Sequence, residues 1–444
     1  MPILSAWIQF IKDRRLLDQF IRKNPFFYFA ARSLLSKFDE SDPEERLKIS
    51  LQRLSEILKM ASKTTYGSTI VPSDTLSDWP LLDKENVRDR GSELLHPCLN
   101  WHINVRASTG GSTGVPLKLV RSMRSIAFEQ ASLDHVLHKA AFQPERAKIA
   151  VLRADSFKDA NDTTPPYWKY THQGNRLVFS ANHLDRSTLP QFIQELNRFQ
   201  PTLLTAYPSS LESLLALAEE QSLPIRISHI LTSSEILTQT LREKSETFAQ
   251  AKVIDLYGQA ERVALSYSLA AGESYFVPGY GFVELKYQDS DAQFDHYEIV
   301  GTGLHNHLMP LVRYRTGDSI RVKKGTSESE LREIALGLRP FHSIAGRKDD
   351  YLATKEGGRL IGMNHIPRNI NNIIQMQMIQ HDWNRIEIRV IPGKNYSKED
   401  EIALLHNVYA KLPDTFHVEI TKTDRLVKTM SGKLPFVIRH ISLE

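Results

Sequence analysis

The chain has 444 residues, more than a single hydrophobic core usually holds, so at least two domains are expected. Its 41% hydrophobic and 24% charged residues are typical of a globular protein and exclude a disordered, collagen-like or disulfide-rich chain. The net charge of +4 includes no long block of either sign, which argues against nucleic acid as a partner. The single cysteine, Cys98, excludes an internal disulfide and favours a reducing compartment, so a cytoplasmic location is expected.

The N-terminal region, residues 1–75, is predicted to be helical. Apolar residues recur every three or four positions in LKISLQRLSEILKMA, and the aspartates and Pro43 of DESDPEERL provide a helix start signal. The apolar stretch 1–10 runs directly into charged residues and lacks the length and flanks of a signal peptide or a transmembrane segment, so neither is expected. The mixture of apolar and basic residues through Phe29 leaves two interpretations open: packing on the main domain, or attachment to a membrane surface.

From about residue 100, strand-like runs such as KIAVLRA, TLLTAY and AKVIDLYG alternate with helical patterns such as STLPQFIQELNRF. This alternation predicts a parallel sheet flanked by helices, whereas the longer, more polar strands after residue 270 indicate antiparallel or barrel-like sheet. The last hundred residues repeat a small strand and helix pattern. We therefore predict an α/β fold in three parts: helices at 1–75 packed on the main domain, a large domain of mixed sheets and helices at 76–347, and a small C-terminal α/β domain at 348–444.

The segment RASTGGSTGVPLKL, residues 106–119, is the most informative of the chain. Three glycines and four hydroxyl side chains fall within seven positions: Ser108, Thr109, Gly110, Gly111, Ser112, Thr113 and Gly114. Glycine lets the backbone turn its N–H groups inward, and Ser and Thr add donors, so this loop can hold phosphate oxygens. A flexible linker is the alternative interpretation. The P-loop signature is absent because no Gly-Lys-Ser/Thr closes the motif.

This loop resembles the Ser/Thr/Gly-rich loop of the adenylate-forming superfamily, which includes acyl-CoA synthetases and non-ribosomal adenylation domains. Four further segments follow in the order of that superfamily: LYGQAE at 256–261, RYRTGD at 313–318, GRKDD at 346–350 and SGK at 431–433. The phenylacetate-CoA ligase and capsular-polysaccharide CapK branch is the most similar, through WPLLDKENVR at 79–88, AYPSSL at 206–211 and TSSEIL at 232–237. The resemblance covers about residues 75–440.

The resemblance implies an ATP site. Tyr257 would lie against the adenine face, where an aromatic ring offers stacking area. Ser234 and Glu235 would line the same pocket, and Gly258 and Gln259 belong to the same nucleotide motif.

The resemblance also implies where the charged groups of the reaction lie. Glu261 would hold Mg²⁺, which prefers carboxylate and phosphate oxygens. Asp318 would accept hydrogen bonds from the ribose hydroxyls, and Arg347 would reach the ribose or the phosphates with its planar donors. Lys433 would be catalytic, because its ammonium group would place positive charge beside the attacking carboxylate and the α-phosphate. Each residue could instead have an ordinary role in a turn, helix or loop.

The resemblance further implies a mobile C-terminal lid. In the superfamily the C-terminal domain pivots at GRKDD, so Asp349 resembles the hinge residue. Arg359 resembles an arginine that relatives place near the second active geometry. The chain departs from the superfamily pattern at Gly111, which raises the glycine content of the loop, and at Ala260, where a threonine hydroxyl usually contacts phosphate. The lysine segment keeps Ser-Gly-Lys and lacks the usual Pro-Arg before it.

Two other kinds of site find less support. The HNH at 305–307 puts two histidines on one face of a strand, but no third ligand is near in the sequence, so a metal pair is not favoured. A serine nucleophile is not indicated, since no G-x-S-x-G elbow is present.

Together these features predict activation of a carboxylic acid to acyl-AMP with pyrophosphate release, followed by transfer to coenzyme A. For this branch an aromatic or arylacetic acid is expected, with Tyr207 and Trp168 as pocket walls. Two alternatives stay open: an amine acceptor, as in ligases that join auxin to amino acids, and a non-catalytic nucleotide-binding component of polysaccharide or secondary-metabolite assembly. A carrier protein as acceptor and a homodimer are likewise left open.

Overall fold

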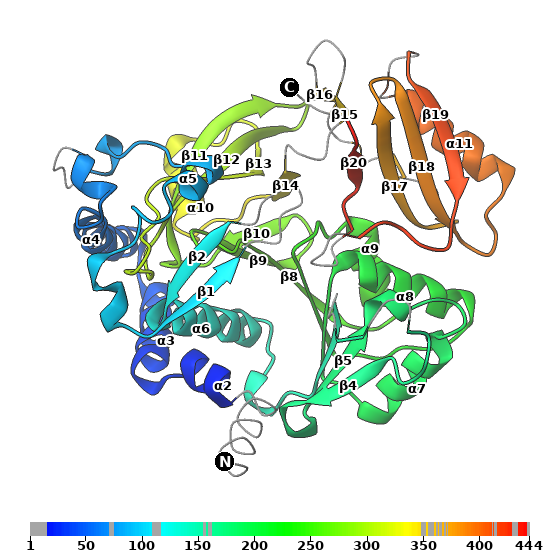
Figure 1. Ribbon diagram of the computed structural model, residues 1–444, viewed down its shortest axis with the longest axis horizontal. Coiled ribbons are helices and arrows are strands. Elements are labelled where there is room, and N and C mark those ends of the chain that lie inside the picture. The colour runs from blue at the N-terminus through cyan, green and yellow to red at the C-terminus, as the bar shows by residue number, and fades with distance from the viewer. Residues whose placement is uncertain are drawn as a thin grey trace. The chain divides into compact units, whose positions relative to one another are not determined.

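The computed structural model of the protein describes residues 16–70, 75–108, 117–153, 157–158, 162–347, 352–353, 359–360, 363, 366–367, 370, 372–410, 412, 415–428 and 434–441. The chain forms two compact units (Figure 1). The first comprises Met1–Ala147, Thr171–Asn175 and Val253–Ala345, and the second comprises Lys148–Tyr170, Arg176–Lys252 and Gly346–Glu444. The sequence prediction of a mixed α/β architecture is confirmed.

The α-helices of the first unit are α2 (Leu16–Arg22), α3 (Pro25–Glu40), α4 (Pro43–Ala61), α5 (Lys84–Asp89), α6 (Met123–Lys139) and α10 (Glu328–Ala335). Short 3₁₀ turns lie at Gly67–Thr69, Leu76–Asp78, Pro97–Trp101, Pro144–Arg146 and His172–Gly174. The predicted start of α4 is confirmed: the Asp42 side chain accepts the backbone N–H of Glu45 at 2.9 Å, with a proline in the first turn. Helix α3 packs on α6, where the Tyr28 hydroxyl donates to Asp134 Oδ2 at 2.6 Å.

The strands of the first unit are antiparallel where their pairing is defined. They are β1 (Asn104–Ser108), β2 (Lys118–Ser122), β8 (Lys252–Gly258), β9 (Leu265–Ala270), β10 (Glu273–Phe276), β11 (Gly281–Ser290), β12 (Phe294–Gly303), β13 (Tyr314–Lys323) and β14 (Ser343–Arg347). Strands β1 and β2 form a hairpin, and β11 to β14 form a four-stranded sheet in sequence order. The later strands share a core with α10. This core includes Phe276, Ile299 and Ile320 from the strands and Ile334 from the helix. The antiparallel sheet predicted after residue 270 is thus present.

The second unit contains the predicted parallel sheet. Its strands β3 (Ile149–Arg153), β4 (Trp168–Thr171), β5 (Arg176–Ser180), β6 (Leu203–Ala206) and β7 (His229–Ser233) lie in the order β7-β6-β3-β5-β4. Helices α7 (Leu189–Phe199), α8 (Pro208–Glu220) and α9 (Gln239–Thr247) accompany it, with a 3₁₀ turn at Ala181–His183. Strands β6 and β7 are parallel with Ala206 opposite Thr232, so Tyr207 and Ser233 follow at one edge of the sheet. Ligands usually bind at the carboxyl edge of such sheets.

The C-terminal part of the second unit has its own sheet. Its elements are β15 (Leu352–Ala353), β16 (Arg359–Leu360), β17 (Ile373–Asp382), β18 (Arg385–Pro392), α11 (Lys398–Tyr409), β19 (His417–Lys422) and β20 (Val437–Arg439). The strand order is β19-β18-β17-β20, with an antiparallel central pair and parallel outer pairs. The core of this part includes Met378 and Ile386 from the sheet and Leu404 and Val408 from α11. Within the ranges given above, no helix is both long and apolar enough to cross a membrane.

Candidate active site

In the first unit, β8 and β13 bring two residues of the predicted nucleotide motif together. The Tyr257 hydroxyl donates to Asp318 Oδ2 at 2.9 Å. Asp318 is only 6% exposed, and its backbone N–H is held by Thr316 Oγ1 at 3.1 Å. The register of β12 against β13 shifts at this point, and Gly317 has a φ of +73°. This conformation is easy for glycine, so the RTGD sequence forms a bulge that positions the carboxylate of Asp318.

The predicted magnesium residue lies in the connection between β8 and β9. The Tyr314 hydroxyl donates to Glu261 Oε1 at 2.7 Å, which orients the carboxylate without neutralising it. Both amide atoms of the Gln259 side chain are shielded from solvent and have no hydrogen-bond partner among the described residues. Buried polar groups are normally paired, so Gln259 has hydrogen-bonding capacity that a bound ligand could use.

A set of buried charges holds this connection in place. Arg121 Nη2 donates to the Ala260 carbonyl at 2.7 Å. Arg262, which has a φ of +58°, donates from Nη1 to the Ser125 carbonyl at 3.2 Å and lies 3.7 Å from Glu129 Oε2. Burial, reinforced by the charge of Arg262, lowers the pKa of Arg121 to about 10, so the guanidinium stays charged near neutral pH. A left-handed conformation is costly for arginine, and these contacts offset that cost.

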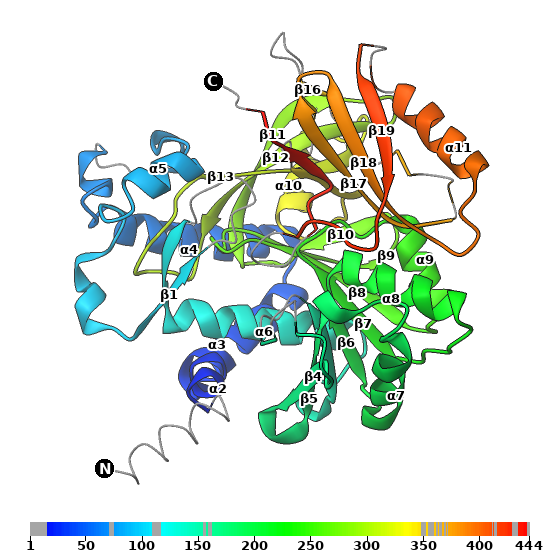
Figure 2. The same cartoon turned by 45° about the vertical axis from the view of Figure 1, so that its right-hand side comes forward.

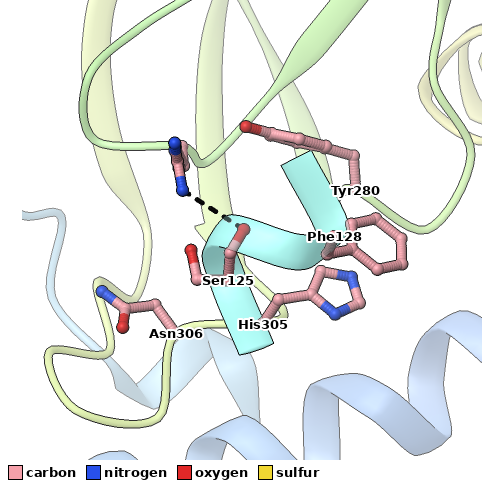
Figure 3. Close-up of a pocket in the computed structure, with 6 residues that line it drawn as sticks. Ser125, Phe128, Tyr280, His305 and Asn306 are labelled. Atoms are coloured by element: carbon pink, nitrogen blue, oxygen red, sulfur yellow. Dashed lines mark hydrogen bonds between the residues drawn. The ribbon is translucent and has the colours of Figure 1, made fainter. Parts of the chain in front are cut away.

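A small pocket lies beside Arg262, and its lining is shown in Figure 3: Ser125, Phe128, Arg262, Tyr280, His305 and Asn306. The Tyr280 hydroxyl donates to Glu129, and burial together with that carboxylate raises the pKa of Tyr280 well above 10. The ring of His305 stacks on Phe128, with centroids 3.4 Å apart. The lining thus includes Arg262, the residue that follows Glu261 in the chain.

The two histidines at 305 and 307 have separate partners. The Nε2 atom of His305 lies 2.7 Å from the Gly279 carbonyl oxygen. Burial holds the pKa of His305 well below 6.5, so the ring is neutral and donates that proton. The Nε2 atom of His307 faces Arg124 Nη1 at 2.7 Å, and burial followed by the charge of Arg124 lowers the pKa of His307 to about 4. Among the described residues, no group of three or more His, Cys, Asp and Glu side chains is arranged to hold a metal.

In the second unit, a polar cluster follows β6 and β7. Ser234 has a φ of +73° directly after β7. Its neighbour Ser233 accepts a hydrogen bond from Arg153 Nη2 at 3.0 Å. The Arg153 guanidinium also lies over the Tyr207 ring, 5.5 Å from its centroid. This cation–π contact orients the ring of Tyr207 at the carboxyl edge of the sheet.

Glu235 joins three segments of the second unit. Its Oε2 accepts the backbone N–H of Ser209, in the first turn of α8, at 2.8 Å. Its Oε1 accepts the backbone N–H of Leu434 at 3.1 Å. Leu434 directly follows Lys433, which lies outside the described residues. A carboxylate at a helix N-terminus is favoured by the helix dipole, so Glu235 links the end of the Ser-Gly-Lys segment to α8.

Gln377 on β17 contacts described residues on both sides of the segment that contains Lys433. Its Oε1 accepts the Val427 N–H at 3.0 Å, and its Nε2 donates to the carbonyls of Val427 and Pro435, both at 2.8 Å. The Gln377 side chain is fully buried. The Lys428 ammonium group donates a hydrogen bond to Asn182 Oδ1 at 3.3 Å. We refer to residues 428–434, of which the structure describes 428 and 434, as the lysine loop.

The other predicted site residues divide into three groups. Trp168 on β4 packs edge-on against Phe179 and Phe192, and β3 and β5 separate its strand from the one that precedes Tyr207. Ser108, Arg347 and Arg359 end or begin strands, and only their backbone is described. The following lie outside the described residues: Thr109, Gly110, Gly111, Ser112, Thr113, Gly114, Asp349 and Lys433.

Sequence reasoning missed the residues that support the site. Tyr314 lies inside the RYRTGD segment, and Arg262 directly follows LYGQAE, so their proximity to the motifs was a usable signal. Arg121 and Glu129 lie far from these motifs in sequence, and Gln377 is 50 and 58 residues from its partners. Those contacts depend on the tertiary fold.

Comparison with known proteins gives consistent matches. The family model described as AMP-binding enzyme matches residues 45–286, and the model of the CapK C-terminal domain matches residues 352–440. Protein CapK of Staphylococcus aureus is 22% identical over 394 residues, covering 87% of this chain and 84% of that protein. Phenylacetate-coenzyme A ligase of Escherichia coli (strain K12) is 23% identical over 358 residues, covering 74% of each.

Solved structures show a similar fold. The structure of 2-hydroxyisobutyryl-CoA ligase in the postadenylation state in complex with R3-HIB-AMP has a TM-score of 0.62 at 13% sequence identity. The alignment covers 89% of this chain and 90% of that one. The same ligase with 2-HIB-AMP has a TM-score of 0.59.

Proposed function

Because the chain belongs to the AMP-binding enzyme family, in the branch of CapK and phenylacetate-CoA ligase, we propose that it activates a carboxylic acid with ATP. The products of the first step are acyl-AMP and pyrophosphate, and coenzyme A is the proposed acceptor in the second. One observation carries the proposal: the hydrogen bond between Tyr257 and Asp318, which brings together the residues proposed to contact adenine and ribose.

The described residues of the first unit suit a magnesium nucleotide. The ring of Tyr257 offers its face to adenine, and Asp318 can accept from the ribose hydroxyls. Glu261, oriented by Tyr314, supplies the carboxylate oxygen that Mg²⁺ prefers. When bound, the metal would neutralise phosphate charge as pyrophosphate leaves. Residues 108–114 are the proposed phosphate loop, and Ser234 and Glu235 are the proposed contributions of the second unit.

In the proposed reaction a carboxylate oxygen attacks the α-phosphorus, a new P–O bond forms, and the bond to the pyrophosphate oxygen breaks. Negative charge builds on the α-phosphate and on the leaving group. The ammonium of Lys433 would stabilise this charge, and a positioned charge of this kind is a large catalytic effect. Contacts at the two ends of the lysine loop support this role. Gln377 donates to the carbonyls of Val427 and Pro435, and Glu235 accepts the N–H of Leu434.

The acid and the acceptor are proposed from the relatives. Phenylacetate-coenzyme A ligase of Escherichia coli and the 2-hydroxyisobutyryl-CoA ligase are CoA ligases by name. We therefore place coenzyme A before an amine as acceptor, and an aromatic or arylacetic acid first among substrates. Tyr207, oriented by Arg153, is the proposed wall of the acid pocket. Trp168 is partly buried and packs against the core of the second unit, from where we propose that it acts on that pocket only indirectly.

Movement of a C-terminal domain would separate the two half-reactions. We propose a domain boundary near residue 348 with Asp349 as its hinge, and Arg347 as a contact to the ribose or the phosphates. Domain closure on a hinge of a few residues is a common way to present one site with two sets of groups.

A pyrophosphate-release assay over a panel of carboxylic acids tests the proposal. At least one acid should give ATP-dependent pyrophosphate, and Lys433→Ala should abolish most of that rate. Trapping the activated acid with coenzyme A, amines or hydroxylamine then identifies the acceptor. Absence of pyrophosphate with every acid, together with an unchanged Lys433→Ala variant, would leave the non-catalytic role, toward which Ala260 in place of the usual threonine points.

A further inference from the structure

Helices α2 and α3 expose a group of aromatic side chains. Phe20, Phe26, Phe27 and Phe29 have exposed fractions of 56%, 83%, 39% and 66%. We refer to the two most exposed of these residues, Phe26 and Phe29, as the aromatic face. Large apolar side chains gathered on a surface usually mark a site of interaction, whereas scattered ones do not.

Packing of α3 does not account for this exposure. The buried side of the helix consists of Tyr28, Ala31, Leu35 and Phe38, and α3 packs on α6, as Figure 2 also shows. Phe26 and Phe29 are one turn apart, and their angular positions in a 3.6-residue helix fall on the side opposite to the buried residues. The helix therefore has one apolar side toward the protein and an aromatic side toward solvent.

Positive charge accompanies the aromatic face. Residues 1–35 contain six Lys and Arg against two Asp, so this segment alone accounts for the whole net charge of +4. Arg22 and Lys23 lie between Phe20 and Phe26 in the sequence. Arg22 is 39% exposed and pairs with Asp18 at 3.0 Å, and Lys23 is 47% exposed and lies 3.6 Å from Asp134 Oδ2. The remainder of the chain is balanced in charge.

We propose that the aromatic face binds the surface of an anionic lipid bilayer. Aromatic rings and Lys or Arg together are the composition of helices that lie in the membrane interface, where the rings enter the headgroup region and the cations meet anionic lipids. A second copy of the chain is a poorer occupant, because a symmetric contact would bring two such positive segments together.

The test is co-sedimentation of the full chain with vesicles of phosphatidylcholine, alone or mixed with phosphatidylglycerol. The chain should bind the anionic vesicles, and added salt should weaken binding, since salt screens surface charge. The double variant Phe26→Gln, Phe29→Gln should reduce binding by about tenfold or more, from the apolar area it removes. Trp101→Gln is the matched control: Trp101 is 88% exposed, lies outside the aromatic face, and should leave binding unchanged.

Three outcomes would overturn the proposal. One is failure of the wild-type chain to sediment with anionic vesicles, and another is wild-type binding by the double variant. The third is a dimer in light scattering that the double variant converts to monomer, which would make the aromatic face a contact between copies. Because both phenylalanines are exposed, circular dichroism should show an unchanged fold in the variant. The inference does not depend on the proposed reaction.

Discussion

Replacement of Gln377 by methionine tests how the lysine loop is held. The change keeps the length of the side chain and removes three hydrogen bonds, to the N–H and carbonyl of Val427 and to the carbonyl of Pro435. Each bond contributes about 1 kcal/mol net, and because Val427 is 44% exposed we expect its backbone to reach water in part and the loss to be about 2–3 kcal/mol. The hydrogen bonds that are lost hold Val427 and Pro435, which lie on either side of Lys433 in the sequence.

The expected effect on the first half-reaction follows from this magnitude. If adenylation requires the three hydrogen bonds of Gln377, their loss of about 2–3 kcal/mol corresponds to a fall of about 30- to 150-fold in the rate of pyrophosphate release. The rate is measured with saturating ATP and acid. Thermal unfolding of the same variant gives the loss of stability, which separates a local effect on the loop from a general one.

Gln380→Met is the matched control. Gln380 lies on the same strand, is also fully buried, and exchanges two hydrogen bonds with the backbone of Ala353, at 2.9 and 2.7 Å. It should lose comparable stability and keep most of the rate of pyrophosphate release. Equal loss of rate in both variants, or an unchanged rate in Gln377→Met, would refute the idea that Gln377 positions the lysine loop.

Three further predictions concern single groups. Asp318→Asn should weaken ATP binding by about 1.5–3 kcal/mol and erase a preference for ATP over 2′-deoxy-ATP. The amide oxygen of the variant can still accept the hydrogen bond from Tyr257. An unchanged preference would show that Asp318 does not contact the ribose. Ala260→Thr should lower the KM for ATP by up to about fivefold, on the order of 1 kcal/mol, in steady-state kinetics; a raised KM would count against a phosphate contact there. Burial and, after it, the charge of Glu235 raise the pKa of Glu212 from 4.5 to about 7. The folded state therefore binds the carboxyl proton more tightly than the unfolded state, and the free energy of unfolding falls as the pH rises from 4.5 to about 7. Glu212→Gln should therefore raise the free energy of unfolding by on the order of 1–2 kcal/mol above pH 7 and change it little near pH 4.5, in denaturant titrations; an equal gain at both values would contradict the shifted pKa.

Much of the fold could be predicted because it rests on local patterns. Short apolar runs such as 149–153 and 203–206 alternate with amphipathic helices and form the parallel sheet. The Asp42 and Pro43 signal places the start of α4. The superfamily also followed from ordered motifs, and the match of the AMP-binding enzyme model to residues 45–286 confirms it.

The support of the site could not be predicted in the same way. Gln377 is one of three glutamines in IIQMQMIQ, and nothing in that sequence indicates that its side chain contacts residues 50 and 58 positions away. The contact of Arg121 with the Ala260 carbonyl spans 139 positions. Trp168 stays a predicted pocket wall, and its packing on Phe179 emerges only from the strand order. Tertiary contacts decide all three.

The central claim is that a carboxylate oxygen attacks the α-phosphorus of ATP. The most direct test uses an accepted acid labelled with heavy oxygen in its carboxyl group, with coenzyme A or hydroxylamine as acceptor and mass spectrometry of the nucleotide product. Attack by the carboxylate leaves one labelled oxygen in AMP after the acyl group departs, and Lys433→Ala should lose this product. Unlabelled AMP, or ADP with labelled phosphate, would contradict the account.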